Sequence, residues 1–247
     1  MVNVLSMNVS DNKADFSTLL SYDEAKALLQ DLDALDNHVE KESAWSVNTE
    51  RKETIRLWKN EWQKMFAVRS DDGIKQPFED SEQAATSWLI QLFNTVFSDQ
   101  QVVLVRSAGE PEYFPASNNK PARIEFAHGF FASALHEISH WCVAGKTRRN
   151  LSDFGYWYAP DGRSAAQQQA FERVEIKPQA LECLFTLACG RPFQVSQDNL
   201  FATFDTSEST FASDVYVQAK KYIAKPDTLP RDAKVLLRTF LSVCAVG

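Results

Sequence analysis

Apolar positions in the first third of the chain recur with the spacing of helices. Leucines between residues 28 and 35 follow a capping box formed by Ser21 and Glu24, so a first helix is expected there. Two further stretches, 50–66 and 80–97, carry leucine and tryptophan among polar residues and predict a second and a third helix. We therefore expect residues 1–80 to form an N-terminal helical extension, whose role the pattern does not indicate.

The pattern changes after residue 100. Residues 101–106 are short and rich in valine, and residues 123–127 alternate polar with apolar, so both stretches predict β-strands. Between them, residues 109–120 hold prolines, a glycine and asparagines, which are typical of a loop. A small β-sheet is therefore expected in the middle of the chain.

The second half of the chain again has helical patterns. Residues 129–144 are almost all apolar or small, which predicts a core helix that Gly145 can end. Residues 165–188 predict a long helix that Pro178 should kink or split in two. Two shorter helices are expected at about 211–224 and 231–243, near the end of the chain. The predicted fold class is α+β and mostly helical. In the main domain, residues 81–247, the core helix packs on the long helix beside the small sheet.

The composition narrows the possible function classes. Hydrophobic residues make up 44% and charged residues 24% of the 247, as in globular proteins, and the net charge of −7 disfavours nucleic-acid binding. The sequence shows no secretory signal and no apolar run of about 20 residues, so no membrane span is expected. The four cysteines form no C-x-x-C pair and lie in apolar runs, which is typical of buried thiols in a reducing compartment. We therefore expect a cytoplasmic protein.

The core helix contains the segment His136-Glu137-Ile138-Ser139-His140. Histidines four residues apart lie on one face of a helix, one turn from each other, and can bind the same metal ion. Glu137 between them can act as a base or orient a bound water, so it is the candidate catalytic residue. Because the surrounding residues are apolar, these polar groups would be costly to bury unless something binds them. A pair of hydrogen-bonded core histidines is the simpler alternative.

A catalytic metal site needs a third protein ligand. The carboxylates available downstream are Glu172, Glu175, Glu182 and Asp153. Glu175 is preferred, with Glu172 as the alternative, because both precede Pro178 in a helix that can pack on the first. The direction of Glu182, beyond the proline, is left open.

The other candidate residues have simpler interpretations. His128, two turns before His136, is expected to cap the helix or to contact the metal ligands without binding the metal itself. His38 is expected at the surface of the extension. The aromatic stretch 154–158 is expected in the core, although it could also line a pocket.

Two chemistries fit a site of two histidines and one carboxylate. With zinc, such a site activates a water for hydrolysis of a peptide or amide, with Glu137 as the general base. With Fe(II), it leaves positions open for O2 and supports hydroxylation. A non-catalytic adaptor with a structural metal, or with none, is a third possibility. The spacing of the motif does not decide between them and by itself favours the hydrolase.

The sequence around the motif resembles the elongation factor P hydroxylase family. The resemblance covers about residues 85–245, is dense between 127 and 200, and finds no counterpart for residues 1–80. The residues that carry it are His128-Gly129-Phe130, Ala134 to Cys142, Asp153 to Tyr158, Pro160 to Arg163, Phe171-Glu172, Val174-Glu175, Lys177 to Leu181 and Asp198-Asn199-Leu200.

This resemblance implies a cytoplasmic metal-dependent hydroxylase that acts on the β-lysylated lysine of translation elongation factor P. It implies a site outside the double-stranded β-helix fold of 2-oxoglutarate oxygenases, with metal ligands at His136 and His140 and a carboxylate within 171–182. Elongation factor P is then the expected partner, Fe(II) the expected metal and O2 the co-substrate, while a need for 2-oxoglutarate is left open. The zinc-dependent hydrolase that uses Glu137 is the alternative.

Overall fold

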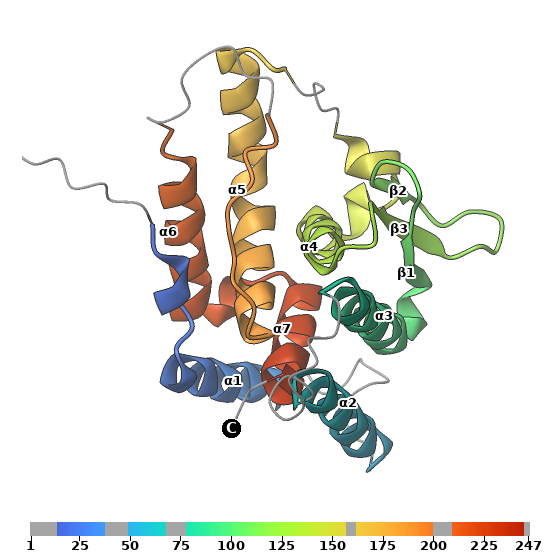
Figure 1. The fold of residues 1–247 in the computed structure, drawn as a ribbon. Coiled ribbons are helices and arrows are strands. Elements are labelled where there is room, and N and C mark those ends of the chain that lie inside the picture. Colours follow the sequence, from blue (N-terminus) through green and yellow to red (C-terminus); the bar gives the residue numbers. More distant parts are fainter. Residues whose placement is uncertain (1–13, 38–48, 68–77, 157–161, 200–208, 245–247) are drawn as a thin grey trace, which may run out of the picture.

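The computed structural model describes residues 14–37, 49–67, 78–156, 162–199 and 209–244 (Figure 1). Most of these residues are helical, with one small sheet, so the expected mostly helical α+β class is confirmed. The helices are α1 (Tyr22–Asn37), α2 (Thr49–Ala67), α3 (Phe78–Val96), α4 (Phe131–Arg148), α5 (Ala165–Ala188), α6 (Phe211–Ala224) and α7 (Arg231–Cys244). The strands are β1 (Val102–Arg106), β2 (Glu112–Phe114) and β3 (Ala122–Phe126).

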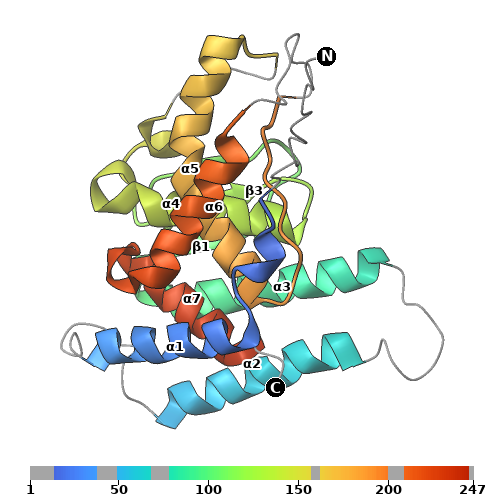
Figure 2. The ribbon, with the colours of Figure 1, turned by 90° about the vertical axis from the view of Figure 1, so that its left-hand side faces the viewer.

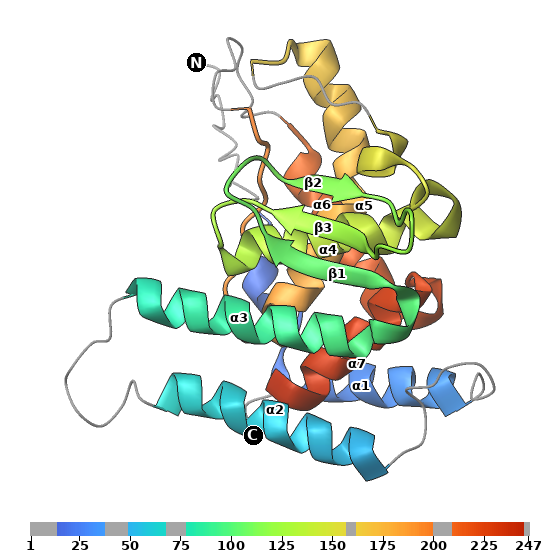
Figure 3. The same ribbon diagram turned by 90° about the vertical axis from the view of Figure 1, so that its right-hand side faces the viewer.

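The sheet has the strand order β1-β3-β2, with β3 parallel to β1 and antiparallel to β2 (Figure 3). Residues on one face of β1 and β3 are buried, among them Leu104, Ile124 and Phe126, which explains the alternating pattern. The prediction that 109–120 is only a loop was wrong, because β2 lies within it. That strand has three residues between two prolines, too short to show a period of its own.

Helix α4 lies at the centre of the molecule, between α5 and the sheet (Figure 1). It buries Leu135, Ile138 and Trp141 because neighbours cover it on several sides, as its apolar sequence predicts. The regular part of the helix ends at Gly145, which has a φ of 66°. A residue with a Cβ is strained at that angle, so the glycine is required by conformation and not by space.

Helix α5 runs without a break through Pro178, so the expected split of this helix was wrong. A proline inside a helix costs about 3 kcal/mol because it removes one backbone hydrogen bond. Pro178 and most residues after it are buried, and α5 packs against α4, α6 and α7. This packing outweighs the lost bond, and the acids before and after the proline therefore belong to one continuous helix.

Helices α1 and α2 form a layer at one end of the molecule, against α7 and α3 (Figure 2). Leu28 and Leu32 of α1 and Trp58 and Trp62 of α2 are buried in the same hydrophobic core as α3 and α7. Arg238 of α7 forms an ion pair with α1, so charged contacts join these helices as well. None of the helices within the described ranges has the length and hydropathy needed to cross a bilayer.

Candidate metal centre

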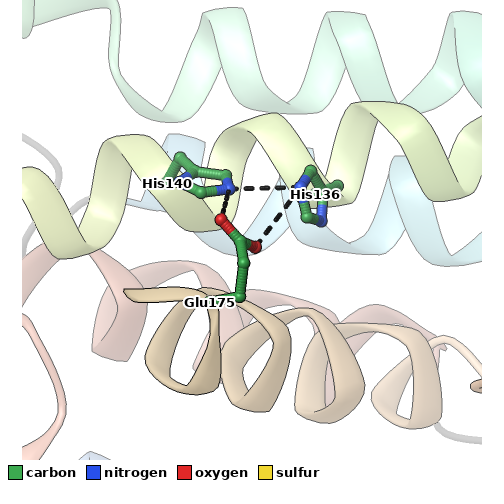
Figure 4. Close-up of side chains that lie close together, drawn as sticks. All are labelled: His136, His140 and Glu175. Atoms are coloured by element: carbon green, nitrogen blue, oxygen red, sulfur yellow. Dashed lines mark hydrogen bonds and ion pairs between the residues drawn. The ribbon is translucent and has the colours of Figure 1, made fainter. Parts of the chain in front are cut away.

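The two histidines of α4 and one acid of α5 meet where these helices pack together (Figure 4). His136 Nε2 and His140 Nε2 lie 3.1 Å apart, and Glu175 Oε1 lies 3.3 Å from His140 Nε2. The other carboxylate oxygen of Glu175, Oε2, lies 3.8 Å from His136 Nε2. Possible ligand atoms of the three side chains all fall within 4.8 Å of one another.

The separation of the histidines suits a shared metal ion. Two nitrogen ligands roughly 2.1 Å from one ion, and at right angles to each other, lie about 3 Å apart. The 3.1 Å between His136 Nε2 and His140 Nε2 matches this value. Two neutral imidazole nitrogens that face each other with lone pairs would repel, so this arrangement needs a proton or a cation between them.

Glu175 supplies the negative charge of the cluster. Its side chain is 1% exposed, and its Oε2 has no hydrogen-bond partner within the described residues. Burial raises the pKa of Glu175, but His140 and His136 outweigh this effect and lower the pKa to about 2. A buried, ionised oxygen without a hydrogen bond costs free energy that a bound cation would recover. This atom and the three donor side chains, two imidazoles and one carboxylate, fit a divalent metal.

Glu182 holds His136 from the opposite side of the ring. Its Oε2 lies 2.8 Å from His136 Nδ1, which leaves Nε2 turned toward His140 and Glu175. Burial lowers the pKa of His136, but Glu182 and then Glu175 and Glu137 outweigh it and raise the pKa to about 10. A carboxylate behind a ligand histidine fixes its tautomer and ring orientation. Glu182 is therefore a partner of His136, outside the group of three side chains that could share an ion.

Glu137 lies beside the cluster without joining it. Its side chain is half-buried and lines the same cavity as the histidines. Burial raises the pKa of Glu137, against the opposing effect of His136 and His140. A carboxylate in such a setting can hold or release a proton next to a bound molecule, as the sequence motif predicts.

The structure does not bring the remaining acids to the cluster. Glu172 accepts hydrogen bonds from Gln168 Nε2 and Ser209 Oγ. Asp153 Oδ1 accepts the backbone N–H of Tyr113 at 2.9 Å, so it ties β2 to the segment after α4. Both therefore have structural partners, although Asp153 also lines the cavity.

His128 takes neither role expected of it. Its side chain is exposed, and it is absent from the lining of the cavity. Phe130 occupies the N-cap position of α4 and makes no side-chain cap. The expectation failed because His128 has a φ of 57°, so the chain turns at this residue before the helix begins. His38 lies outside the described residues.

A cavity of about 940 Å³ opens over the cluster. Among the carboxylate and guanidinium groups that line it, acids outnumber the one arginine, Arg163, and aromatic side chains cover part of its wall. The acids are Glu110, Glu137, Asp153, Glu175, Glu182 and Asp198, and the rings are those of Tyr113, Phe154 and Phe171. Phe154 is buried and also stacks on Tyr113, so it belongs to both the core and the pocket. Residues 157 and 158 of the same aromatic stretch lie outside the described ranges.

Two buried polar residues of this wall were not anticipated from the sequence. Arg163 lies over the ring of Phe171 and bonds the backbone of 197–198, and Gln179 bonds the backbone of Ser196. Both contacts join segments far apart in the chain, so no local pattern could have predicted them. A polar side chain inside an otherwise apolar helix, as at Gln179, is the signal that was available.

Comparison with known proteins gives concordant results. The family model for elongation factor P hydroxylase matches residues 92–244, which include α4, α5 and the whole cluster. The elongation factor P lysine hydroxylase of Haemophilus influenzae is 46% identical over 156 residues, or 62% of this chain and 86% of that protein.

Proposed function

Because the chain belongs to the elongation factor P hydroxylase family, we propose that it hydroxylates a lysine side chain of elongation factor P at a metal held by His136, His140 and Glu175. The observation that carries the site assignment is the convergence of three ligand atoms from α4 and α5 at the floor of a cavity. The proposed metal is Fe(II), which in a site of two histidines and one carboxylate supplies the oxidising chemistry with O2.

The protein side chains around the metal have separate tasks in this proposal. Glu182 keeps Nδ1 of His136 hydrogen-bonded, so that Nε2 remains directed at the metal position. Glu137, whose pKa is raised by burial, is placed to orient a ligand or a water and to hold a proton at its carboxylate.

The cavity suits a cationic, aliphatic side chain. Carboxylates such as Glu110 and Asp198 attract an ammonium group, and the rings of Tyr113 and Phe171 can pack against methylene groups. These features support a lysine substrate, and the form proposed is the β-lysylated lysine of elongation factor P. Since the substrate is a translation factor, the enzyme is proposed to act in the cytoplasm.

A zinc-dependent hydrolase is the weaker function. Its support is the H-E-x-x-H segment alone, whereas the similarity to the hydroxylases extends over α4, α5 and the cavity wall. A non-catalytic adaptor is disfavoured for the same reason.

The function is tested by the mass of elongation factor P from cells that lack this protein. Cells supplied with the wild-type chain, or with His128→Ala, should yield a factor heavier by one oxygen atom at the modified lysine. Cells with no copy, or with His136→Ala, should yield the lighter factor. His128→Ala is the matched control because this histidine is exposed and outside the cavity. Equal masses with and without the protein would refute the proposal.

A further inference from the structure

Gln179 connects the metal cluster to one wall of the cavity. It lies on α5 four residues after Glu175, on the same face of the helix, and its side chain is 1% exposed. Gln179 Nε2 donates to Ser196 O at 2.7 Å, and Ser196 N donates to Gln179 Oε1 at 3.0 Å. Both the nitrogen and the oxygen of the side-chain amide are therefore hydrogen-bonded to the backbone of Ser196, in the segment 194–198.

This pairing determines which way the amide points. The backbone N–H of Ser196 can bond only the oxygen of the Gln179 amide, so the nitrogen must lie on the other side. An amide nitrogen carries two N–H groups, and Ser196 O takes one of them. Gln179 and Glu175 are neighbours one turn apart on α5, and the amide is among the groups that lower the pKa of Glu175. Ser196 thus fixes the orientation of a donor beside the carboxylate.

The segment 194–198 forms part of the cavity and has a second attachment. Gln194, Ser196 and Asp198 line the cavity. Gln168 Nε2, three turns before Gln179 on α5, donates to Gln197 O at 2.9 Å. Gln168 is also buried, but its side chain bonds Arg163 and Glu172 and makes no hydrogen bond to Glu175. The wall is therefore attached to α5 at two glutamines, of which one lies next to Glu175.

We propose that Gln179 is a positioning residue that holds the Glu175 carboxylate in place for the metal and makes that position depend on the 194–198 wall. This inference rests on the proposed function, because it takes Glu175 as a ligand. Loss of the amide would free Glu175 to rotate away from the histidines, while the three ligands themselves would remain. The effect should therefore include a loss of metal affinity in addition to any loss of stability.

The test compares Gln179→Met with Gln168→Met in the full-length chain, using Co(II) as the probe. Both variants remove a buried amide that bonds the same wall, so both should lower the melting temperature. Only Gln179→Met should weaken Co(II) binding, by about 10- to 100-fold, the usual effect of removing a group that orients a ligand. The Co(II) absorption spectrum of this variant should also change, and Gln168→Met should keep the wild-type spectrum.

Three results decide the outcome. Equal Co(II) affinities for the two variants would overturn the role of Gln179. If Gln179→Met does not fold, Ser196→Pro removes the N–H that orients the amide and should weaken Co(II) binding in the same direction; wild-type affinity there would also overturn it. Co(II) affinity that is unchanged in Glu175→Gln would instead refute the metal centre itself, which separates failure of this inference from failure of the proposed function.

Discussion

The acids on α5 differ in their contacts, and this difference separates the proposed ligand, Glu175, from its neighbours. Glu175 lies next to both histidines and has a buried oxygen without a hydrogen-bond partner within the described residues. Glu172, one turn earlier, is bonded to Gln168 and Ser209. Position along the sequence makes the two acids nearly equivalent, whereas their surroundings do not.

Glu175→Gln should therefore lose most of its bound metal, because an amide replaces an ionised ligand oxygen. Glu172→Gln is the matched control, with the same chemical change one turn away, and should keep wild-type metal content. Elemental analysis of both purified variants measures this directly. The reverse order of metal content would assign the third ligand to Glu172.

Metal binding should also release a proton from His136. Burial lowers the pKa of His136, but the neighbouring carboxylates, chiefly that of Glu182, outweigh burial and raise the pKa to about 10 before a metal ion binds. Near neutral pH the ring is then an imidazolium, and a metal ion must displace the proton on Nε2. Glu175, with a pKa of about 2, is already ionised and releases none.

Calorimetry in buffers of different ionisation enthalpy counts these protons. We expect about one proton released per metal ion near neutral pH. The apparent affinity should accordingly rise with pH up to about 10, where His136 loses its proton without metal. A binding enthalpy that is the same in all buffers would show that His136 is neutral before the metal binds.

Part of this cluster is predictable from the sequence. Histidines four residues apart share a face of any helix, so the spacing alone predicts that His136 and His140 lie side by side. Glu182 could not be placed, because the expected break at Pro178 left its direction open. Gln179 could not be given a role, because its partner Ser196 belongs to an irregular segment that only the folded chain brings near.

At the scale of elements, the start of α4 depends on a residue of α3. Phe130 at the N-cap position makes no side-chain bond, and Glu82 Oε1 accepts the backbone N–H of Phe131 at 2.8 Å instead. The same carboxylate pairs with Arg191, which lies over the ring of Phe131. Glu82, Arg191 and Phe131, from three segments of the chain, thus fix the start of the helix that carries the histidines.

Glu82→Ala should destabilise the protein by about 1–3 kcal/mol, because it leaves a buried N–H and an arginine without their partner. Gln83→Ala, an exposed neighbour on the same helix, should change stability little. Denaturant unfolding of the two variants measures the difference. If Gln83→Ala were as destabilising as Glu82→Ala, the cap would not be important.

The elements themselves were mostly predictable, since strong helical periodicity gives most of the helices within a few residues. The failures have local causes. Strand β2 is too short for a repeat, and it exists because β3 offers a free edge to pair with. The continuity of α5 at Pro178 depends on burial against three other helices, which no local pattern shows.

At the scale of the whole molecule, helix α2 contacts the helix that carries the proposed metal ligands. Trp62 of α2 lies 4.4 Å from Trp88 of α3 between ring centroids and 5.9 Å from Phe131 at the start of α4. The family model begins at residue 92 and so does not include α2, although α2 packs against the start of α4. We propose that the role of residues 1–80 includes this support.

Trp62→Ala should lower the free energy of unfolding by about 3–5 kcal/mol, the usual cost of removing a buried tryptophan. Leu57→Ala is the control on the same helix, because Leu57 is 50% exposed. Thermal unfolding, monitored by the circular dichroism of the helices, compares the two variants. Similar melting temperatures for both variants would show that α2 is attached only loosely.

The central claim is that one metal ion sits between His136, His140 and Glu175. A crystal of the iron-loaded protein, measured at the iron absorption edge, tests it most directly. The account predicts an anomalous peak roughly 2.0–2.2 Å from both Nε2 atoms and from an oxygen of Glu175. A peak bound by Glu172 or Glu182 in place of Glu175, or one away from both histidines, would contradict it.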